Sequence, residues 1–519
     1  MVDIYEKINQ LYDKRRQVEL GGGDERIAKQ HEKGKMTARE RIDYLLDDGS
    51  FVELNPFMEH RVSDFGMDKS KAAGEGVVTG YGKIDGRPLY LFAQDFTVYG
   101  GALGEMHARK VAAVMDLAAK NGTPFVGLND SGGARIQEGV SSLDGYGHIF
   151  YRNSIYSGVI PQISVILGPC AGGAVYSPAI TDFVVMVEET SQMFITGPKV
   201  IETVTGEKIT SEDLGGAAVH NSKSGNAHIK ASNEEEALDA VKRLIHYLPS
   251  NNKEKPPLIE EEVAEVQSDY RPELTDLIPF DAIRPYDVKL IIEQIVDEQS
   301  FFEIHSDFAK NVVVGFARLK GKSIGLVCNN PKYLAGGLDI DSSDKVSRFI
   351  RFCDAFHIPL ITFEDVTGFF PGVKQEHGGI IRHGAKILYA YSEATVPKIT
   401  VITRKAYGGA YVALNSKSIG ADIVYAWPNA EIAVMGPEGA ANIIFAKEIK
   451  ESENSDETRQ EKIETYREKF ANPYVAAGLG MVDDVIDPRE TRIALMNALE
   501  MLNNKQEERP YKKHGNIPL

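Results

Sequence analysis

The chain has 519 residues, 43% of them hydrophobic, so it is globular and too long for a single core. Its net charge of −17 argues against nucleic acid or an anionic membrane surface as the main partner. Three cysteines without a CxxC pair exclude a disulfide framework and a zinc ribbon. We therefore expect two domains and, because the charged N-terminus resembles no signal peptide, a cytoplasmic location.

The first 48 residues predict two helices on either side of a glycine break at 21–23. Apolar residues recur on one face of the first helix, and the second is expected over 25–46. The basic run from His31 to Arg41 could reach a phosphate. A solvated helix face is the expected role of this run, because most charge runs in helices face water.

The next region alternates strands with helices. Residues 76–86 predict a hairpin with an Asp-Gly turn, and residues 89–93 its following strand. A Gly-rich loop at 99–104 precedes a helix over 105–120, and 124–135 is a buried strand ending in a polar turn. This order predicts an α/β fold of stacked ββα units with the helices outside.

A Pro-rich, polar segment over 249–257, followed by three glutamates, is typical of an inter-domain linker. The sequence therefore predicts four parts, namely an N-terminal domain 1–255, a linker 256–275, a C-terminal domain 276–505 and a tail 506–519.

Past this linker the same landmarks return in the same order, which indicates two homologous domains. The period is far too long for a solenoid. Six pairs lie 235 residues apart: Gly80 and Gly315, Gly86 and Gly321, Gly101 and Gly336, Pro124 and Pro359, Asp130 and Asp365, and Gly133 and Gly368. Gly173 and Gly409 are 236 apart, and the dipeptides beginning at Gly197 and Gly436 are 239 apart.

Each predicted domain contains a strand-like run that leads into a Gly-Gly turn, at 168–178 and again at 403–411. A strand that enters such a turn and then a helix directs backbone N–H groups into open space, which suits an anion or a developing oxyanion. The alternative is close strand–helix packing that only glycine allows. The duplication favours a pair of oxyanion sites, as a reaction with two oxyanions would need.

Other catalytic motifs are missing. We expect no nucleophile elbow, and the sequence contains no HExxH, Walker A or ATP-binding motif. Asp130-Ser131 resembles the start of a hydrolase site but has no evident histidine partner, and His377 and His383 have the wrong spacing for a metal site on one helix face. We therefore expect no metal, and backbone electrostatics is the best candidate for catalysis.

Long motifs carry a family resemblance over nearly the whole chain. Asn129–Gly139, Gly168–Pro178 and Phe194–Pro198 resemble the N-half of the biotin-dependent acyl-CoA carboxyltransferases, such as the propionyl-CoA carboxylase β subunit and the methylmalonyl-CoA decarboxylase α subunit. Leu338–Ser343, Gly378–Gly384, Ala394–Tyr411 and His514–Leu519 resemble the C-half. The resemblance implies two crotonase-like (ClpP/crotonase) ββα-superhelix domains.

The resemblance also implies site residues. The N–H groups of Gly172 and Gly173 would hold the enolate oxygen of a coenzyme A thioester, and those of Gly409 and Ala410 the ureido oxygen of biotin as carboxybiotin releases CO2. The biotin nitrogen would then take the α-proton of the acyl-CoA. By analogy with other crotonase-type sites, Gly100 and Gly101 would flank the thioester, with Gly336 and Gly337 as counterparts around biotin.

Two positions depart from the family pattern. Family members regarded as propionyl-CoA carboxylases often have Asp where this chain has Val412, so Val412 would reshape the acyl pocket or simply pack in the core. Thr367 replaces a proline near the presumed biotin side.

The chain has no Met-Lys-Met biotin-attachment sequence and no ATP-binding module, so biotin must arrive on another polypeptide. The family implies a homo-oligomer built from dimers, usually a hexamer, with the active site between the N-domain of one protomer and the C-domain of the other. A biotin carboxylase and biotin carboxyl carrier subunit is the preferred partner, and a membrane decarboxylase subunit the alternative. An inactive CoA-binding scaffold, or a hydratase or isomerase with a positioned glutamate, is a further alternative.

Overall fold

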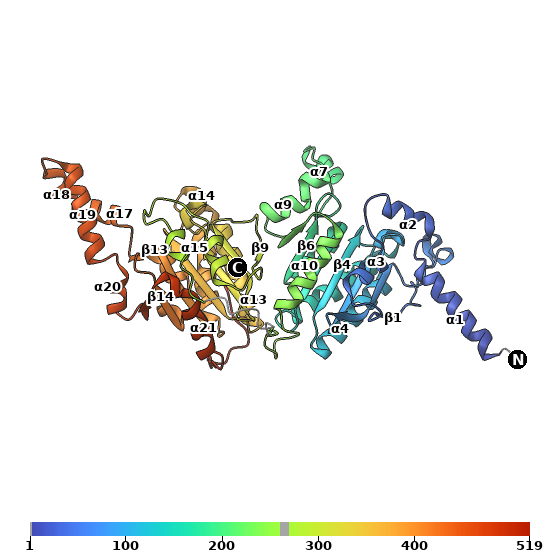
Figure 1. The fold of residues 1–519 in the computed structure, drawn as a ribbon. Coiled ribbons are helices and arrows are strands. Elements are labelled where there is room, and N and C mark those ends of the chain that lie inside the picture. The colour runs from blue at the N-terminus through green and yellow to red at the C-terminus, as the bar shows by residue number, and fades with distance from the viewer. Residues whose placement is uncertain (1–2, 260–268) are drawn as a thin grey trace. The chain divides into compact units, whose positions relative to one another are not determined.

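The computed structural model describes residues 3–259 and 269–519, and it divides into two compact units, residues 1–254 and 255–519. Each unit contains one eight-stranded sheet with helices beside it (Figure 1). The two sheets have the same strand order. In each sheet the two strands of the central hairpin pair antiparallel. The strand after the hairpin pairs parallel to the hairpin's second strand. The predicted pair of homologous α/β domains is therefore confirmed.

The sheet of unit 1 has the order β1-β2-β3-β4-β5-β6-β8, with β7 paired to β5. Its strands are β1 (Val52–Leu54), β2 (Val77–Ile84), β3 (Arg87–Gln94), β4 (Phe125–Ser131), β5 (Gln162–Ala171), β6 (Phe183–Val187), β7 (Gln192–Phe194) and β8 (Ile229–Ala231). Its helices are α1 (Ile4–Glu19), α2 (Asp24–His31), α3 (Ala38–Leu45), α4 (Glu105–Asn121), α5 (Val140–Ile155), α6 (Tyr176–Ile180), α7 (Pro198–Thr205), α8 (Ser211–Gly215), α9 (Ala217–Ser222) and α10 (Glu234–Tyr247).

The sheet of unit 2 has the order β16-β14-β13-β12-β11-β10-β9, with β15 paired to β13. Its strands are β9 (Phe302–Ile304), β10 (Val312–Leu319), β11 (Lys322–Asn329), β12 (Leu360–Val366), β13 (Lys398–Tyr407), β14 (Ile423–Ala426), β15 (Glu431–Ala433) and β16 (Asp484–Val485). Its helices are α11 (Leu274–Leu277), α12 (Lys289–Ile295), α13 (Ile340–Ala355), α14 (Val373–Gly378), α15 (Ile380–Glu393), α16 (Gly408–Ala413), α17 (Pro437–Ile444), α18 (Ala446–Glu451), α19 (Ser455–Lys469), α20 (Pro473–Gly478) and α21 (Thr491–Met501).

The predicted hairpin of unit 1 is present as β2 and β3, joined by Asp85-Gly86. Both turn residues have positive φ, 49° and 76°, as a two-residue turn of this kind requires. Lys320 and Gly321 join β10 to β11 in the same way, with φ of 52° and 72°. The hairpins of the two units therefore have the same kind of two-residue turn, with positive φ at both positions.

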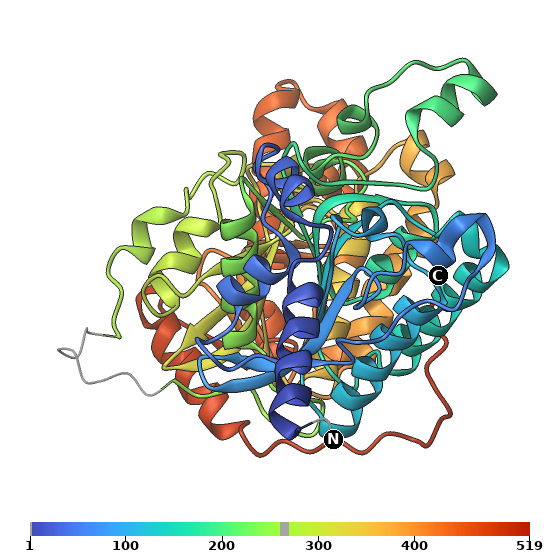
Figure 2. The same ribbon diagram turned by 90° about the vertical axis from the view of Figure 1, so that its right-hand side faces the viewer.

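The N-terminal segment differs from the prediction, because it forms three helices and not two. The expected second helix ends with α2 at His31. The chain then passes through Gly34, which has a φ of 70°, and a new helix, α3, begins at Ala38. Thr37 caps α3: its hydroxyl accepts from the N–H of Glu40, whose carboxylate accepts from the N–H of Thr37. Helix α1 has several exposed apolar residues and is seen in dark blue at the front of Figure 2.

Part of the predicted linker, residues 260–268, lies outside the described residues. Its described ends bond to unit 2, since Arg318 donates to the Pro257 carbonyl at 3.1 Å and the Arg271 N–H donates to the Arg489 carbonyl at 2.9 Å. The boundaries at 255, 275 and 505 stay predictions. In the described part of the chain, no helix is both long and apolar enough to cross a membrane.

Trp427, the single tryptophan of the chain, is buried in the core of unit 2 among the side chains of Ile399, Val401 and Leu495. Its indole N–H donates to the hydroxyl of buried Thr491 at 3.0 Å. A buried donor of this kind is costly to leave without a partner.

We predict that Thr491→Val lowers the free energy of unfolding of unit 2 by about 1–3 kcal/mol, because the buried indole N–H loses its acceptor. The measurement is denaturant unfolding followed by tryptophan fluorescence, which reports unit 2 because Trp427 is the sole tryptophan. Thr491→Ser is the matched control, since it keeps the hydroxyl. Equal stability of the valine and serine variants would contradict the role given to this hydrogen bond.

Candidate functional site: two Gly-Gly turns at the ends of parallel strands

The first Gly-Gly turn follows β5 in unit 1. Gly172 and Gly173 open a short 3-10 helix, Gly172–Val175, which continues into α6. Gly172 has a φ of 61°, which favours glycine. The first N–H groups of a helix have no acceptor within it, so this turn offers donors to an anion. A Cβ on Gly173 would lie 3.0 Å from the ring of buried Tyr146, so packing also restricts this position.

The second Gly-Gly turn follows β13 in unit 2. Gly408 and Gly409 open α16, which also contains Ala410 and Val412. Gly408 has a φ of 62°, and a Cβ there would lie 3.1 Å from the Val434 carbonyl oxygen. A Cβ on Gly409 would meet no atom within 4 Å among the described residues. The face of the turn at Gly409 is therefore open.

The two turns can be aligned residue by residue from the end of the preceding strand. Gly172 and Gly408 are both the first residue after the strand and both have left-handed φ, so they correspond. It follows that Gly173 corresponds to Gly409 and Ala174 to Ala410. The predicted donor pairs, Gly172 with Gly173 and Gly409 with Ala410, are thus displaced by one residue from each other.

A glycine-containing loop lies beside each turn. In unit 1 the 3-10 helix Tyr99–Gly101 contains Gly100 and Gly101, which both have a φ of 62°. The Gly132 N–H donates to the Gly100 carbonyl at 2.9 Å, and a Cβ on Gly101 would overlap the Asp130 carbonyl oxygen. Since Ser131 pairs with Cys170 on β5, this loop and the turn at Gly172 contact the same short segment.

The corresponding loop of unit 2 is the 3-10 helix Leu334–Gly336, followed by Gly337. A Cβ on Gly336 would overlap the carbonyl oxygen of Asp365, so Gly336 corresponds to Gly101. Ala335, with a φ of 50°, then corresponds to Gly100, and Gly337 has no glycine counterpart. Thr367 lies at this loop, with its hydroxyl 3.5 Å from the Ala335 carbonyl.

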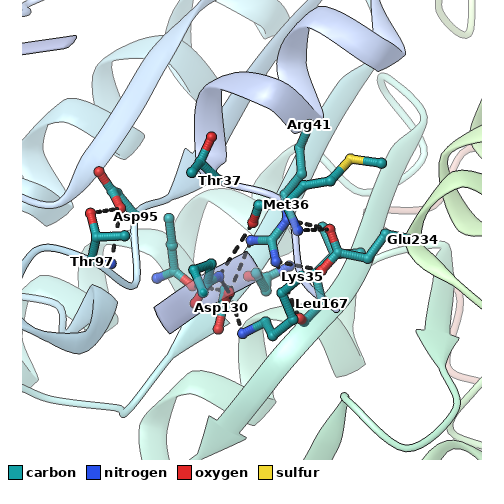
Figure 3. A network of polar contacts seen from close by, with 12 residues as sticks. Lys35, Met36, Thr37, Arg41, Asp95, Thr97, Asp130, Leu167 and Glu234 are labelled. Atoms are coloured by element: carbon teal, nitrogen blue, oxygen red, sulfur yellow. Dashed lines mark hydrogen bonds and ion pairs between the residues drawn. The ribbon is translucent and has the colours of Figure 1, made fainter. Parts of the chain in front are cut away.

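A buried network of charges in unit 1 surrounds Asp130, whose carbonyl lies against Gly101 of the loop (Figure 3). Asp130 contacts Lys35 at 2.6 Å and Arg41 at 3.0 Å, and Gln30 donates to the same carboxylate oxygen at 3.1 Å. Arg41 also forms a two-pronged ion pair with Glu234, at 2.8 and 2.6 Å. The expected solvated helix face is therefore wrong for Lys35 and Arg41, which are 6% and 0% exposed.

The burial of these groups has an electrostatic consequence. Burial lowers the pKa of Lys35 from its ordinary value, and the adjacent carboxylate of Asp130 opposes that shift. Two cations and two carboxylates balance the network of Lys35, Arg41, Asp130 and Glu234. Balanced pairing is what allows charges to persist in an interior, where an unpaired charge is very costly.

Unit 2 has a related but different arrangement. Asp365, 1% exposed, accepts from the Arg404 side chain at 2.9 Å, and Lys405 lies 3.6 Å away. The Lys405 N–H also donates to the Asp365 carboxylate, at 3.2 Å. Arg404 then donates to the carbonyls of Pro279, Asp281 and Arg284 and lies 4.9 Å from the centre of the Tyr286 ring.

A second buried network fixes the far end of the loop in unit 1. Arg135 pairs with Glu75 at 2.8 Å and with Glu138 at 2.7 Å, and it donates to the Ala102 carbonyl at 3.1 Å. Glu138 accepts from the N–H of Glu105 at 2.7 Å. Since the Glu138 carboxylate is engaged by Arg135 and by the N–H of Glu105, it is not the free acid that a hydratase would need.

A cavity of about 360 Å³ lies between α2 and the loop of unit 1. It is lined by cations and aromatic rings, with residues Arg26, Lys29, Gln30, Lys33, Phe96, Thr97, Tyr99 and Gly100. Lys29 is also paired with Glu25, and Arg26 donates to the Thr97 carbonyl at 3.0 Å. A cationic cavity beside Gly100 suits a ligand with several negative charges next to an apolar ring.

The other predicted candidates have structural surroundings. Val412 is half-buried and packs against a cluster that includes Ile402, Tyr411 and Ala421. The Ser131 hydroxyl is buried and accepts from the Gly133 N–H at 3.1 Å. His383 lies 2.8 Å from Asp344. Within residues 3–259 and 269–519, no group of three or more His, Cys, Asp or Glu residues could hold a metal ion.

Sequence reasoning missed several polar residues of the interior. Lys35 and Arg41 are 95 and 89 positions from Asp130 in the chain, and local patterns carry no signal for such a contact. Glu364 was also missed: it is fully buried, neither carboxyl oxygen has a hydrogen-bond partner in the described part of the chain, and burial raises its pKa well above the ordinary value. The motif Asn129–Gly139, the departure at Thr367 and the spacing of 235 that pairs Asp130 with Asp365 pointed to this region but not to Glu364.

Comparison with known proteins identifies the family. A model described as a carboxyl transferase domain matches residues 29–517. A putative propionyl-CoA carboxylase beta chain of Bacillus subtilis is 63% identical, covering 99% of this chain and 100% of that protein. The methylmalonyl-CoA decarboxylase subunit alpha of Propionigenium modestum is 60% identical, covering 99% of both chains.

A solved structure gives the same answer. The crystal structure of transcarboxylase 12S, described as a hexamer assembly with methylmalonyl-coenzyme A and methylmalonic acid bound, matches with a TM-score of 0.97. Its sequence is 52% identical, and the match covers 100% of this chain and 99% of that one. The crotonase-like fold and the resemblance drawn from the motifs are confirmed, and the chain belongs to the carboxyl transferase family.

Proposed function

We propose that this chain is the carboxyltransferase subunit of a biotin-dependent acyl-CoA carboxylase, and that it moves CO2 from carboxybiotin to the α carbon of a short-chain acyl-CoA such as propionyl-CoA. The observation that carries the proposal is the duplicated Gly-Gly turn, at Gly172 in unit 1 and Gly408 in unit 2. Relatives that are carboxylase and decarboxylase subunits over their full length support the same transfer.

On the acyl-CoA side, the N–H groups of Gly172 and Gly173 would hold the thioester oxygen as it becomes an enolate. A donor aimed at a developing oxyanion in a dry site contributes about 3–4 kcal/mol of barrier lowering. Gly100 and Gly101 would flank the thioester. The cavity lined by Arg26, Lys29 and Lys33 lies beside Gly100, and its charge suits the phosphate groups of coenzyme A.

On the biotin side, the open face of the turn supports binding, because a Cβ on Gly409 would meet no atom within 4 Å in the part of the chain that the structure describes. The N–H groups of Gly409 and Ala410 would hold the ureido oxygen, and Gly336 and Gly337 would border the ring. When bound, biotin supplies the carboxyl group and accepts the α-proton of the acyl-CoA. Backbone donors suffice for this chain's part, which fits the structural roles of Ser131, Glu138 and His383.

The proposed assembly is a dimer-based homo-oligomer, as a hexamer, because transcarboxylase 12S is described as a hexamer assembly. Biotin would arrive on a biotin carboxylase or biotin carboxyl carrier subunit. The second candidate is the α subunit of a methylmalonyl-CoA decarboxylase with a membrane decarboxylase partner, which the 60% identity to such a subunit supports. A cytoplasmic location is proposed for the first candidate.

The function is tested by carboxyl transfer from a panel of carboxyacyl-CoAs to free biotin. We expect biotin-dependent loss of the carboxyl group from methylmalonyl-CoA and malonyl-CoA. The N-acetylcysteamine thioester of methylmalonate, which lacks the phosphates, should have a higher KM. Absence of biotin-dependent transfer across the panel would support a CoA-binding scaffold, and turnover of an enoyl-CoA without biotin would support a hydratase.

An affinity pull-down distinguishes the two directions. Tagged chain is expected to recover an ATP-dependent biotin carboxylase subunit, identified by mass spectrometry and its carried biotin. Recovery of a membrane-embedded decarboxylase subunit from detergent extract would replace the first candidate by the second.

We predict that Gly409→Val reduces biotin-dependent transfer by at least about 10²-fold, because loss of one oxyanion donor's alignment has effects of that size. Its melting temperature should stay near that of the parent, since no atom of the described residues lies within 4 Å of the added Cβ. Gly173→Val should lower both transfer and stability, because its side chain presses on Tyr146. Full transfer by Gly409→Val would remove this turn from the mechanism.

Val412 tests the acyl specificity. We expect Val412→Asp to change the order of preference across the carboxyacyl-CoA panel. For two substrates that differ by one methylene, the ratio of their kcat/KM values should shift by about tenfold. Val412→Ile is the matched control that keeps an apolar side chain. An unchanged order of preference in the aspartate variant would leave Val412 as a packing residue of the cluster it contacts.

A further inference from the structure

In both units the pairing of two parallel strands shifts register at a buried aspartate. The ladder between β4 and β5 shifts between Asn129 and Ser131, so Asp130 is the residue at the irregularity. The ladder between β12 and β13 shifts between Glu364 and Val366, so Asp365 has the same place. Such an irregularity leaves the residue without a partner in the ladder.

Each aspartate touches the glycine loop of its proposed site, and the residue after it pairs with the strand that leads to the Gly-Gly turn. The Asp130 carbonyl lies against Gly101, and the Asp365 carbonyl lies against Gly336. The neighbouring residues pair with the strands that lead to the Gly-Gly turns, Ser131 with Cys170 and Val366 with Ala406. The position of each carboxylate therefore affects a loop and a turn together.

The two units neutralise this aspartate from different parts of the chain. In unit 2 the cations are Arg404 and Lys405, on the strand that runs into Gly408. Gly168 occupies the strand position that corresponds to Arg404, and a Cβ there would overlap the Asp130 carboxylate. In unit 1 the cations are Lys35 and Arg41, from the segment around the start of α3 (Figure 3).

We propose that Lys35 and Arg41 are positioning residues for the acyl-CoA side and act through Asp130, whereas Arg404 and Lys405 position the biotin side through Asp365. The assignment of substrates to sides rests on the proposed function. The N-terminal segment is then part of the acyl-CoA site, although it lies about 130 residues before the turn that it positions.

The physical reason is charge balance in a dry interior. If one cation is removed, the aspartate keeps an uncompensated charge and moves toward another donor or takes up a proton. The carbonyl of the same residue then shifts against Gly101 or Gly336. A shift of about 1 Å at a reacting group can reduce turnover by about 10²-fold. Each pair of cations should therefore affect one substrate and spare the other.

The test measures kcat and both KM values, for methylmalonyl-CoA and for free biotin, in the full-length oligomer. Lys35→Met is expected to raise the KM for methylmalonyl-CoA by about 10- to 100-fold, with the biotin KM within about twofold of the parent. Arg404→Met is expected to show the converse. Arg404→Lys should recover part of the loss.

Arg39→Met is the matched control, because Arg39 lies on α3 beside Arg41 but pairs with Glu53 at 2.9 Å, away from the network. It should leave both KM values unchanged. If Lys35→Met and Arg404→Met change the two KM values equally, or change neither, the proposal is overturned.

A charge-balanced variant decides the outcome where a single variant fails to fold. Lys35→Met with Asp130→Asn removes one charge of each sign and keeps the Arg41 pair with Glu234. No charge is left uncompensated in the folded double variant, so its methylmalonyl-CoA KM should lie between those of the parent and Lys35→Met, with the biotin KM unchanged. A larger change in the biotin KM than in the methylmalonyl-CoA KM would reject the proposal. Absence of transfer in the parent protein would instead overturn the proposed function.

Discussion

In each unit, a carboxylate buried where two parallel strands change register has to be balanced by cations, and the loops beside it depend on that balance. Asp130 and Asp365 are almost fully buried, and each contacts two basic side chains. Buried charges of this kind contribute little net stability relative to apolar packing, and their value is in fixing one arrangement. The arrangement fixed here brings a glycine loop and a Gly-Gly turn to the same edge of the sheet.

The fold could be predicted from the sequence because its evidence is local and repeated. The Asp-Gly turns, the apolar strands and the spacing of 235 between landmarks each depend on residues close to one another or on a simple count. The break between α2 and α3 was missed although its evidence was present, because Thr37 and Glu40 have the spacing of a capping box. Helix periodicity alone does not detect such a restart.

The site could be predicted only in part. The glycines of the turns and loops are identified by motif, and left-handed φ or close backbone contacts at Gly101, Gly172, Gly336 and Gly408 explain why glycine is required. The cations that neutralise Asp130 lie far away in sequence, and the run that contains them has the composition of an exposed helix. Tertiary packing decides which basic residues are buried, and the pattern of charges along the chain carries no information about that packing.

The burial of all three cysteines has a practical consequence for spectroscopy. Cys170, Cys328 and Cys353 are buried, and burial raises the pKa of Cys170 to about 12, so reactive thiolate is scarce in the folded chain near neutral pH. A thiol introduced at an exposed position such as Tyr5, which is 71% exposed on α1, would be the preferred point of attachment for a maleimide dye. The three existing thiols should therefore react little with such a dye, and an introduced cysteine would carry most of the label.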